Sequence, residues 1–183
     1  MKKNSFTITL LTLLFLPLSL GAVHKVRIAS ATGYDLLNEL SGGQYLSEEI
    51  KIAVAHPISD RNKPMNVELS VNTMYSTNFA DTKLSSLAFG FGIRVFLNTL
   101  TVIRPYFTHE VLTRLLYLDG QSNMAKTYSI LLGLGLDIPL DPEKDGSSIF
   151  FDVSYLFYES GYFGIPGDEV KTLGLTVGYS IGF

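Results

Sequence analysis

Within the last fourteen residues of the chain, Val170–Phe183, small and apolar side chains alternate strictly from Thr172 onward. Large apolar residues occupy every second position from Leu173 to Phe183, and Gly, Ser or Thr stand between them. Successive side chains of a strand point to opposite faces, so this segment would have one bulky face and one nearly bare face. A soluble strand normally turns charged groups to water. The pattern instead favours a narrow barrel with its apolar face toward lipid and its small residues inside.

The same period of two recurs along the chain and predicts eight strands. They are Val23–Ala31, Glu49–His56, Asn66–Ser76, Leu84–Leu97, Thr101–Val111, Thr127–Ile138, Ser148–Tyr158 and Val170–Phe183. Single-chain barrels close with an even number of strands. With the N-terminus in the periplasm, the outward connections are 32–48, 77–83, 112–126 and 159–169, and three of these four exceed every inward turn. We therefore predict an all-β fold, an eight-stranded antiparallel up-and-down transmembrane β-barrel.

The alternative fold is a soluble antiparallel barrel or sandwich with an apolar interior. Its outer face would carry many charges, and the small-residue faces of 84–97, 127–138 and 170–183 carry almost none. This favours the membrane barrel. Pro105 fits that barrel less well, because a proline inside a strand normally marks an edge or a bulge.

The N-terminus has the order of a secretory signal peptide. Two lysines precede an apolar run over residues 6–20, which Gly21 and Ala22 follow. We predict a signal peptide over residues 1–22, with cleavage after Gly21 or Ala22, and a barrel domain over residues 23–183. The alternative is an uncleaved anchor helix, for which the apolar run is short.

Composition narrows the function. A chain of 183 residues favours one domain, and a net charge of −3 argues against a nucleic-acid binder that relies on bulk charge. After the N-terminal segment there is no run of 18 apolar residues, which excludes a bundle of membrane helices. The lack of cysteine excludes disulfides, thiolate metal sites and a lipid-modified N-terminal cysteine.

Charged residues of the predicted strands fall mostly on the small-residue face and carry both signs. They are Lys25, Arg27, Lys51, Glu68, Arg94, Arg104, Glu110, Asp137 and Asp152. The interior of an eight-stranded barrel is just wide enough for side chains, and unpaired charges there are strongly unfavourable. We predict an interior network of ion pairs and hydrogen bonds that plugs the lumen, formed by Glu68, Arg94, Arg104, Glu110, Asp137 and Asp152. The alternative is a selective or gated path.

The end of the chain matches a known motif. Thr176, Gly178, Ile181 and Phe183 fit the order polar-x-Gly-x-x-apolar-x-aromatic of the C-terminal signal of bacterial outer-membrane barrels. The mature chain resembles the small eight-stranded barrels of Gram-negative bacteria, of the outer-membrane-protein X, A-domain, W and opacity types. The resemblance implies an outer-membrane protein without enzymatic turnover, whose C-terminal signal is read by the barrel-assembly machinery. It also implies outer-membrane lipid as surroundings, and a partner or small hydrophobic ligand.

Three functions stay open within this class. The first is a structural or surface-interaction role through the outer loops, and the apolar residues of 32–48 and 159–169 are either a binding surface or a rim helix. The second is a conduit for small hydrophobic molecules, as in the W type, with a lateral opening at Pro105. The third is a lipid A deacylase, a class that carries His-x-Ser, but the nearest stretch here is His109-Glu110-Val111. We expect no cofactor and no catalytic residue.

Aromatic residues lie near the predicted strand ends. They are Tyr75, Tyr128, Phe157 and Tyr158 at one side and Phe183 at the other. They fit interfacial girdles, and they fit equally the ordinary preference of aromatic residues for strands.

Overall fold

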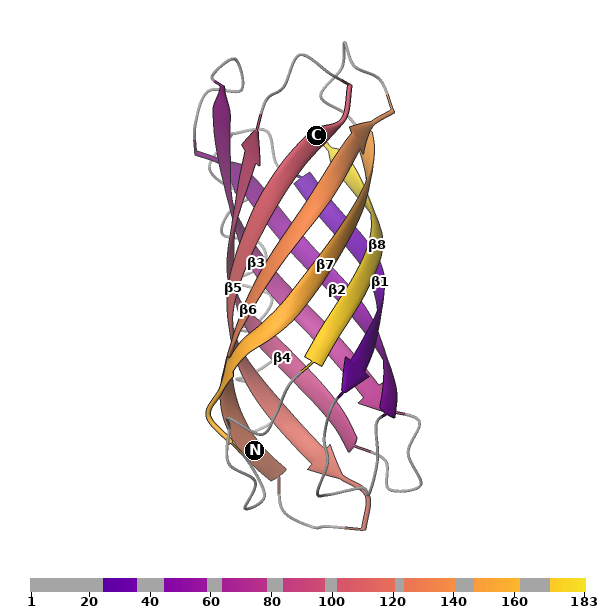
Figure 1. Ribbon diagram of the computed structural model, residues 1–183. Coiled ribbons are helices and arrows are strands. Elements are labelled where there is room, and N and C mark those ends of the chain that lie inside the picture. The colour runs from indigo at the N-terminus through magenta and orange to yellow at the C-terminus, as the bar shows by residue number, and fades with distance from the viewer. Residues whose placement is uncertain are drawn as a thin grey trace.

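The computed structural model describes residues 25–35, 45–58, 64–78, 84–97, 102–120, 124–140, 147–161 and 172–183. Eight tilted strands surround a common axis (Figure 1). They are β1 Lys25–Asp35, β2 Tyr45–Pro57, β3 Met65–Asn78, β4 Leu84–Leu97, β5 Arg104–Leu118, β6 Met124–Pro139, β7 Ser147–Glu159 and β8 Thr172–Gly182. Among the described residues, no helix has the length and apolar character needed to cross a bilayer.

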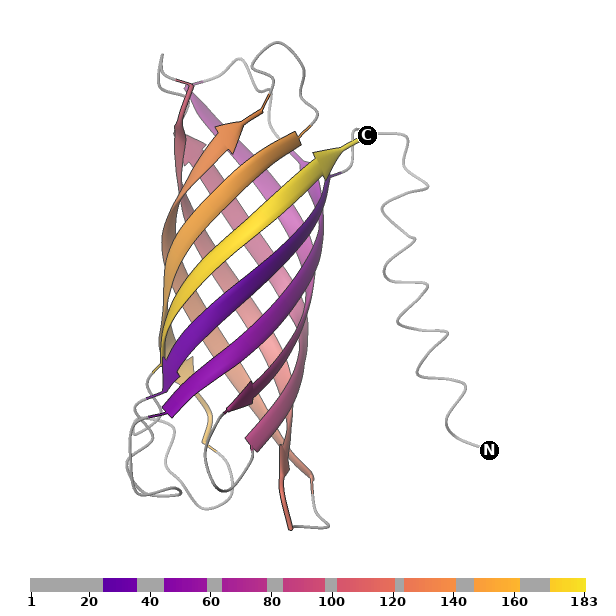
Figure 2. The same ribbon diagram turned by 90° about the vertical axis from the view of Figure 1, so that its right-hand side faces the viewer.

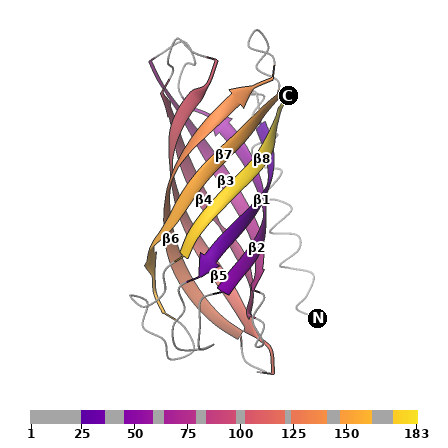
Figure 3. The same ribbon diagram turned by 45° about the vertical axis from the view of Figure 1, so that its right-hand side comes forward.

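The sheet closes on itself. Each strand pairs antiparallel with the next one along the chain, and β8 pairs with β1. This closing ladder runs from the pair Lys25 and Gly182 to the pair Asp35 and Thr172. Figures 2 and 3 show β1 and β8 side by side at the front of the barrel. The predicted eight-stranded antiparallel up-and-down barrel is confirmed.

β8 shows which face of the barrel is apolar. Leu173, Leu175 and Val177 are 47, 59 and 52% exposed, whereas Gly174 and Gly178 between them are buried. The bulky residues therefore point outward and the glycines point into the lumen, as the alternation predicts. This arrangement is the reverse of a soluble barrel with an apolar interior.

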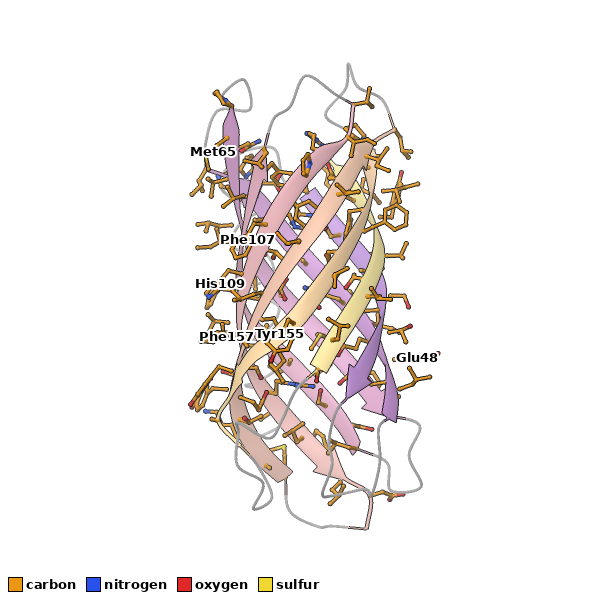
Figure 4. The ribbon with its side chains drawn as sticks, in the orientation of Figure 1. Glu48, Met65, Phe107, His109, Tyr155 and Phe157 are labelled. Carbon is orange, nitrogen blue, oxygen red and sulfur yellow. The ribbon has the colours of Figure 1, made fainter. Side chains whose placement is uncertain are left out.

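An apolar outer surface extends around all the strands. Its most exposed members include Phe91, Leu134 and Phe157, and Figure 4 shows Phe107 projecting from the outer face of β5. The strands are 11 to 16 residues long, and a tilted strand needs about 9–11 residues to cross a bilayer. The barrel is thus long enough to span one.

The hairpin of β5 and β6 is longer than predicted. The sequence pattern placed 112–126 in an outward loop, but β5 continues to Leu118 and β6 begins at Met124. The alternation in fact continues within β5: Leu112 and Leu116 are buried, whereas their neighbours Val111 and Tyr117 are exposed. The change of direction comes only at Asp119-Gly120, where Gly120 has a φ of +82°, a conformation that favours glycine.

β7 contains a bulge that the strict alternation did not predict. Phe157 and Tyr158 are consecutive and are both exposed, whereas Leu156 and Glu159 on either side are buried. The register with β6 shifts at this point. Because a bulge inserts one extra residue, the positions beyond it change faces. Glu159, predicted to begin an outer loop, therefore belongs to the strand and points into the lumen.

Pro105 causes no break in the barrel. It is the second residue of β5 and lies opposite Leu136 of β6, and the neighbouring residue Tyr106 lies opposite Phe96 of β4. A proline at the beginning of a strand removes little from the ladder. At the position where a lateral opening was considered, Pro105 is paired with β6, and the pairing of β5 with β4 begins at the next residue, Tyr106.

Some predictions lie outside the described residues. These include the signal peptide over residues 1–22 and the beginning of the first predicted strand at Val23. The apolar parts of the outer loops, 36–40 and 162–165, lie outside them as well.

Candidate functional site inside the barrel

Three aromatic side chains lie inside the barrel, where the pattern predicted mainly slender or charged groups. Phe96, Tyr106 and Phe150 are each 2% exposed. They fit because other strands carry glycine there: a Cβ at Gly135 would overlap the Tyr106 ring, and a Cβ at Gly178 would overlap the Phe150 ring. The small-residue faces of β6 and β8 therefore make room for bulky side chains from β5 and β7.

Arg94 of β4 lies between two of these rings. Its guanidinium carbon is 4.1 Å from the centroid of Tyr106 and 4.7 Å from that of Phe150. One of its nitrogens is 3.6 Å from a carboxylate oxygen of Asp152, and the Tyr106 hydroxyl donates to the same oxygen at 3.0 Å. The cation is thus held by an anion and by two aromatic faces, a favourable arrangement for guanidinium.

Glu68 of β3 joins two cations of β1. Lys25 donates to Glu68 Oε1 at 3.0 Å, and Arg27 donates to Oε2. All three residues are buried. Since an ionised carboxylate only accepts hydrogen bonds, two basic partners suit both of its oxygens.

Two further pairs connect other strands. Lys51 of β2 pairs with Glu110 of β5, which is not a neighbouring strand, so this contact crosses the lumen. Arg104 Nη2 lies 2.5 Å from Asp137 Oδ2, and the Ser148 hydroxyl donates to Asp137 Oδ1 at 2.6 Å. Charge-assisted bonds of this kind compensate part of the cost of burying charge.

A fifth group, centred on Arg114 and Glu159, was not among the predicted residues. Glu159 accepts hydrogen bonds from Thr127 and from Ser129, the latter at 2.6 Å, and lies 3.6 Å from Arg114 Nη1. Arg114 also donates to Ser86 Oγ at 3.2 Å. Sequence reasoning missed Arg114 because its segment was assigned to a loop, although the alternation around it continues. Nothing in the alternation reveals the bulge that turns Glu159 inward.

The six predicted network residues all point into the lumen. Glu68, Arg94, Glu110, Asp137 and Asp152 are buried, and the Arg104 side chain is 20% exposed. Within this set the structure pairs Arg94 with Asp152 and Arg104 with Asp137. Glu68 and Glu110 instead contact the three basic residues of β1 and β2.

Little free space lies between these groups. A cavity of about 10 Å³, near the space one water molecule needs, is lined by residues that include Asn72, Arg94 and Glu110. Nearer the hairpin of β5 and β6, Met74, Ala88 and Leu112 form an apolar cluster in the lumen. Buried side chains of several strands thus lie close together at these two levels.

The four residues of the C-terminal motif divide between the two faces. Thr176 and Gly178 are buried in the lumen, whereas Phe183 is 71% exposed. Ile181 lies on the outer face of β8, with intermediate exposure.

The residues of the considered catalytic stretch point apart. His109 lies on the outer face of β5 (Figure 4), and Glu110 points into the lumen and pairs with Lys51. Adjacent strand residues cannot share a site on one face, so these two do not form a catalytic pair. Within the described strands, no three His, Asp or Glu side chains are grouped as a metal site requires.

The comparison with solved structures concerns the fold. Neisserial surface protein A is 17% identical, with a TM-score of 0.62, over 87% of this chain and 97% of that chain. The attachment invasion locus protein Ail of Yersinia pestis is 16% identical, with a TM-score of 0.53, over 88% of this chain and 99% of that chain. The outer membrane enzyme PagL is 11% identical, with a TM-score of 0.53, over 85% of this chain and 98% of that chain.

No protein-family model matches the chain, and the search of curated proteins gives no match. The structural neighbours include an enzyme, so the shared architecture does not decide between catalytic and other roles. Their barrels and this one agree over nearly the whole length of both chains. The chain therefore has the fold of the small eight-stranded outer-membrane β-barrels.

Proposed function

We propose that this chain is an integral, non-enzymatic protein of the bacterial outer membrane, exported with a cleaved signal peptide. Its lumen is plugged, and it acts through outer loops that meet a partner at the cell surface. The observation that carries this proposal is the reversed packing of the barrel. Bulky apolar side chains such as Phe91 and Leu134 are 65 and 68% exposed, and leaving such a surface in water would be strongly unfavourable.

The plug is supported by the contacts across the lumen. Lys51 and Glu110 connect opposite walls, and Arg94 fills the space between Tyr106 and Phe150. Ions would have to displace these groups in order to pass. A closed lumen favours a structural role of the barrel or an interaction role of its loops over transport through the lumen.

Cell fractionation together with gel migration tests the proposal. The full chain should sit in the outer-membrane fraction, and its unheated sample should migrate differently from its heated sample on a denaturing gel. In planar bilayers, the purified barrel should give no ion conductance. Recovery from the aqueous periplasmic extract would contradict the membrane location, and steady conductance would contradict the plug.

The C-terminal residues Thr176, Gly178, Ile181 and Phe183 are proposed to engage the barrel-assembly machinery. Phe183 is well placed for this, because it is exposed at the end of the chain. Removing Phe183 should slow insertion by purified assembly machinery in vesicles but leave spontaneous refolding in detergent unchanged. Equal slowing of both processes would mean that the residue acts only on folding.

A conduit for small hydrophobic molecules is the second candidate. The feature that favours it is an apolar groove of about 580 Å³ on the outer surface, lined by residues that include Pro105, Phe107 and Leu136. Passage would require the strands to separate beside Pro105. Assays of the uptake of small hydrophobic molecules with Pro105→Ala test this candidate. If the conduit opens beside Pro105, the substitution should change the uptake rate, and an unchanged rate would contradict the conduit.

A further inference from the structure

A second apolar groove lies on the outer surface across β3, β4, β5 and β6. It has a volume of about 470 Å³, within the range of about 300–1,000 Å³ found for small-molecule sites. The groove passes over the backbone of Gly90, between the outward side chains of Phe89 and Phe91. A Cβ at Gly90 would overlap the Val111 carbonyl oxygen, so the backbones of β4 and β5 approach closely there. Its walls are the outward side chains of Val71, Phe89, Phe91, Val111 and Tyr128.

A lysine stands beside this groove. Lys126 is exposed on the outer face of β6, and its Nζ lies 5.0 Å from the ring centroid of Tyr128, which lines the groove. The backbone of Tyr128 is fixed by Ser160: the Tyr128 amide donates to Ser160 Oγ at 3.0 Å, and the Tyr128 carbonyl accepts from the Ser160 amide at 3.0 Å. The backbone that carries the Tyr128 ring therefore has a defined position at the groove.

Charge is scarce on this surface. Among the described strand side chains, the other charged group on the outer face is Glu48, which is exposed on β2. Figure 4 shows Glu48 on the opposite side of the barrel from His109 and Phe107 of β5. The outward charge beside the groove is thus the Lys126 ammonium, whereas the outward carboxylate of Glu48 lies on another side of the barrel.

We propose that the groove and Lys126 together bind one molecule of a phosphorylated membrane lipid. An acyl chain lies along the apolar walls, and the phosphate meets the Lys126 ammonium. Tyr128 suits the boundary between the two, because it has an apolar ring and a polar hydroxyl. A lysine near a membrane surface contributes about a fivefold preference for anionic over neutral lipid. This inference rests on the proposed membrane location.

The groove beside Pro105 serves as an internal comparison. It is of similar size, about 580 Å³, and like the groove beside Lys126 it has no charged residue among its described lining residues. The grooves differ in the cation beside them, because Arg104 next to Pro105 pairs with Asp137 in the lumen, whereas Lys126 is exposed on the outer face. Acyl chains that enter the groove beside Pro105 would have no reason to prefer a phosphate headgroup. The headgroup preference should therefore depend on Lys126 and not on the apolar surface in general.

Native mass spectrometry of the full refolded chain tests the proposal, with phosphatidylglycerol and phosphatidylcholine of the same acyl chains as probes. We expect one phosphatidylglycerol to be retained about fivefold more tightly than phosphatidylcholine. Lys126→Gln should abolish this preference, and the matched Glu48→Gln should leave it unchanged. Val111→Phe, which fills the groove, should weaken retention of both lipids.

Three results would overturn the proposal. They are a preference that survives Lys126→Gln, retention unaffected by filling the groove, and displacement of phosphatidylglycerol by inorganic phosphate, which would indicate an ion site. Each variant is first checked for heat-modifiable gel migration, and Val71→Phe replaces Val111→Phe if the latter does not fold. A barrel that refolds and fractionates with membranes but shows no headgroup preference refutes only this inference. A chain found in the aqueous extract refutes the proposed function.

Discussion

Replacing Arg94 with methionine should destabilise the barrel, because the change leaves a buried carboxylate without its cation. Arg94 and Asp152 are 6 and 7% exposed, and their charged groups are 3.6 Å apart. Removing one partner of a buried ion pair typically costs about 3–5 kcal/mol. Methionine keeps much of the side-chain volume, and Asp152 retains the hydrogen bond from Tyr106 at 3.0 Å. We therefore expect a loss of about 3 kcal/mol, at the lower end of that range.

A second substitution separates the lost pair from lost packing. In Arg94→Met/Asp152→Leu both charges are absent, and apolar replacements of a whole buried pair are often neutral or stabilising. The Tyr106 hydroxyl then still has the Phe151 carbonyl as an acceptor, at 3.4 Å. The double variant should accordingly be more stable than Arg94→Met alone, although it carries one more change.

Urea titration of barrels refolded in lipid vesicles measures these differences. The chain has no tryptophan, so far-ultraviolet circular dichroism and gel migration follow the unfolding. Glu48→Gln, which removes an exposed charge of β2, is the control and should change the free energy of unfolding by no more than about 0.5 kcal/mol. An Arg94→Met barrel as stable as this control, or a double variant that is less stable than Arg94→Met, would refute the reasoning.

Three more predictions concern the interior. Gly178→Ala should lower the free energy of unfolding by about 1–3 kcal/mol, because the added methyl group overlaps the Phe150 ring; urea titration measures the loss, and Phe150→Leu in the same chain should recover most of it. Glu159→Gln should cost about 1–3 kcal/mol through its buried hydrogen bonds, whereas deletion of Phe157, the extra residue of the bulge, should cost less, because Leu156, Tyr158 and Glu159 then alternate regularly and Glu159 still points inward; an equal or larger loss in the same titration would contradict this description of the bulge. Alanine at both Arg94 and Phe150 should produce channel openings in planar bilayers, and a silent double variant would mean that other groups close the lumen.

The alternation of side chains predicted the fold well because it is a local property of each strand. The bounds of β4, Leu84–Leu97, match the prediction, since large apolar residues occupy every second position from Leu87 to Leu97. The end of β5 was wrong because its lumen side changes character, from the polar Glu110 to the apolar Leu112 and Leu116. A pattern that expects small or polar residues inside then predicts a loop.

The partners within the lumen could not be predicted from alternation. The period of two tells which face a residue occupies, but not which residues of the other strands lie at the same level. That level depends on the stagger of all strands around the closed barrel. Glu68 therefore meets Lys25 and Arg27 of β1, although Arg94 is its direct partner on the neighbouring strand β4. The aromatic rings were unexpected for the same reason, because the glycines that accommodate them lie on other strands.

Gly178 shows why a motif position and a packing position need separate tests. Its place in the C-terminal motif implies recognition during assembly, while its contact with the Phe150 ring limits its size in the folded barrel. Packing acts in any solvent, but recognition acts only when the machinery inserts the chain. Gly178→Ala/Phe150→Leu relieves the overlap with the ring without restoring the motif, while the close approach to the Ala29 Cβ, at 2.8 Å, stays in both variants. If this double variant is stable in detergent but is inserted slowly by purified machinery, Gly178 has both roles, and if it is inserted at the normal rate, packing alone explains the glycine.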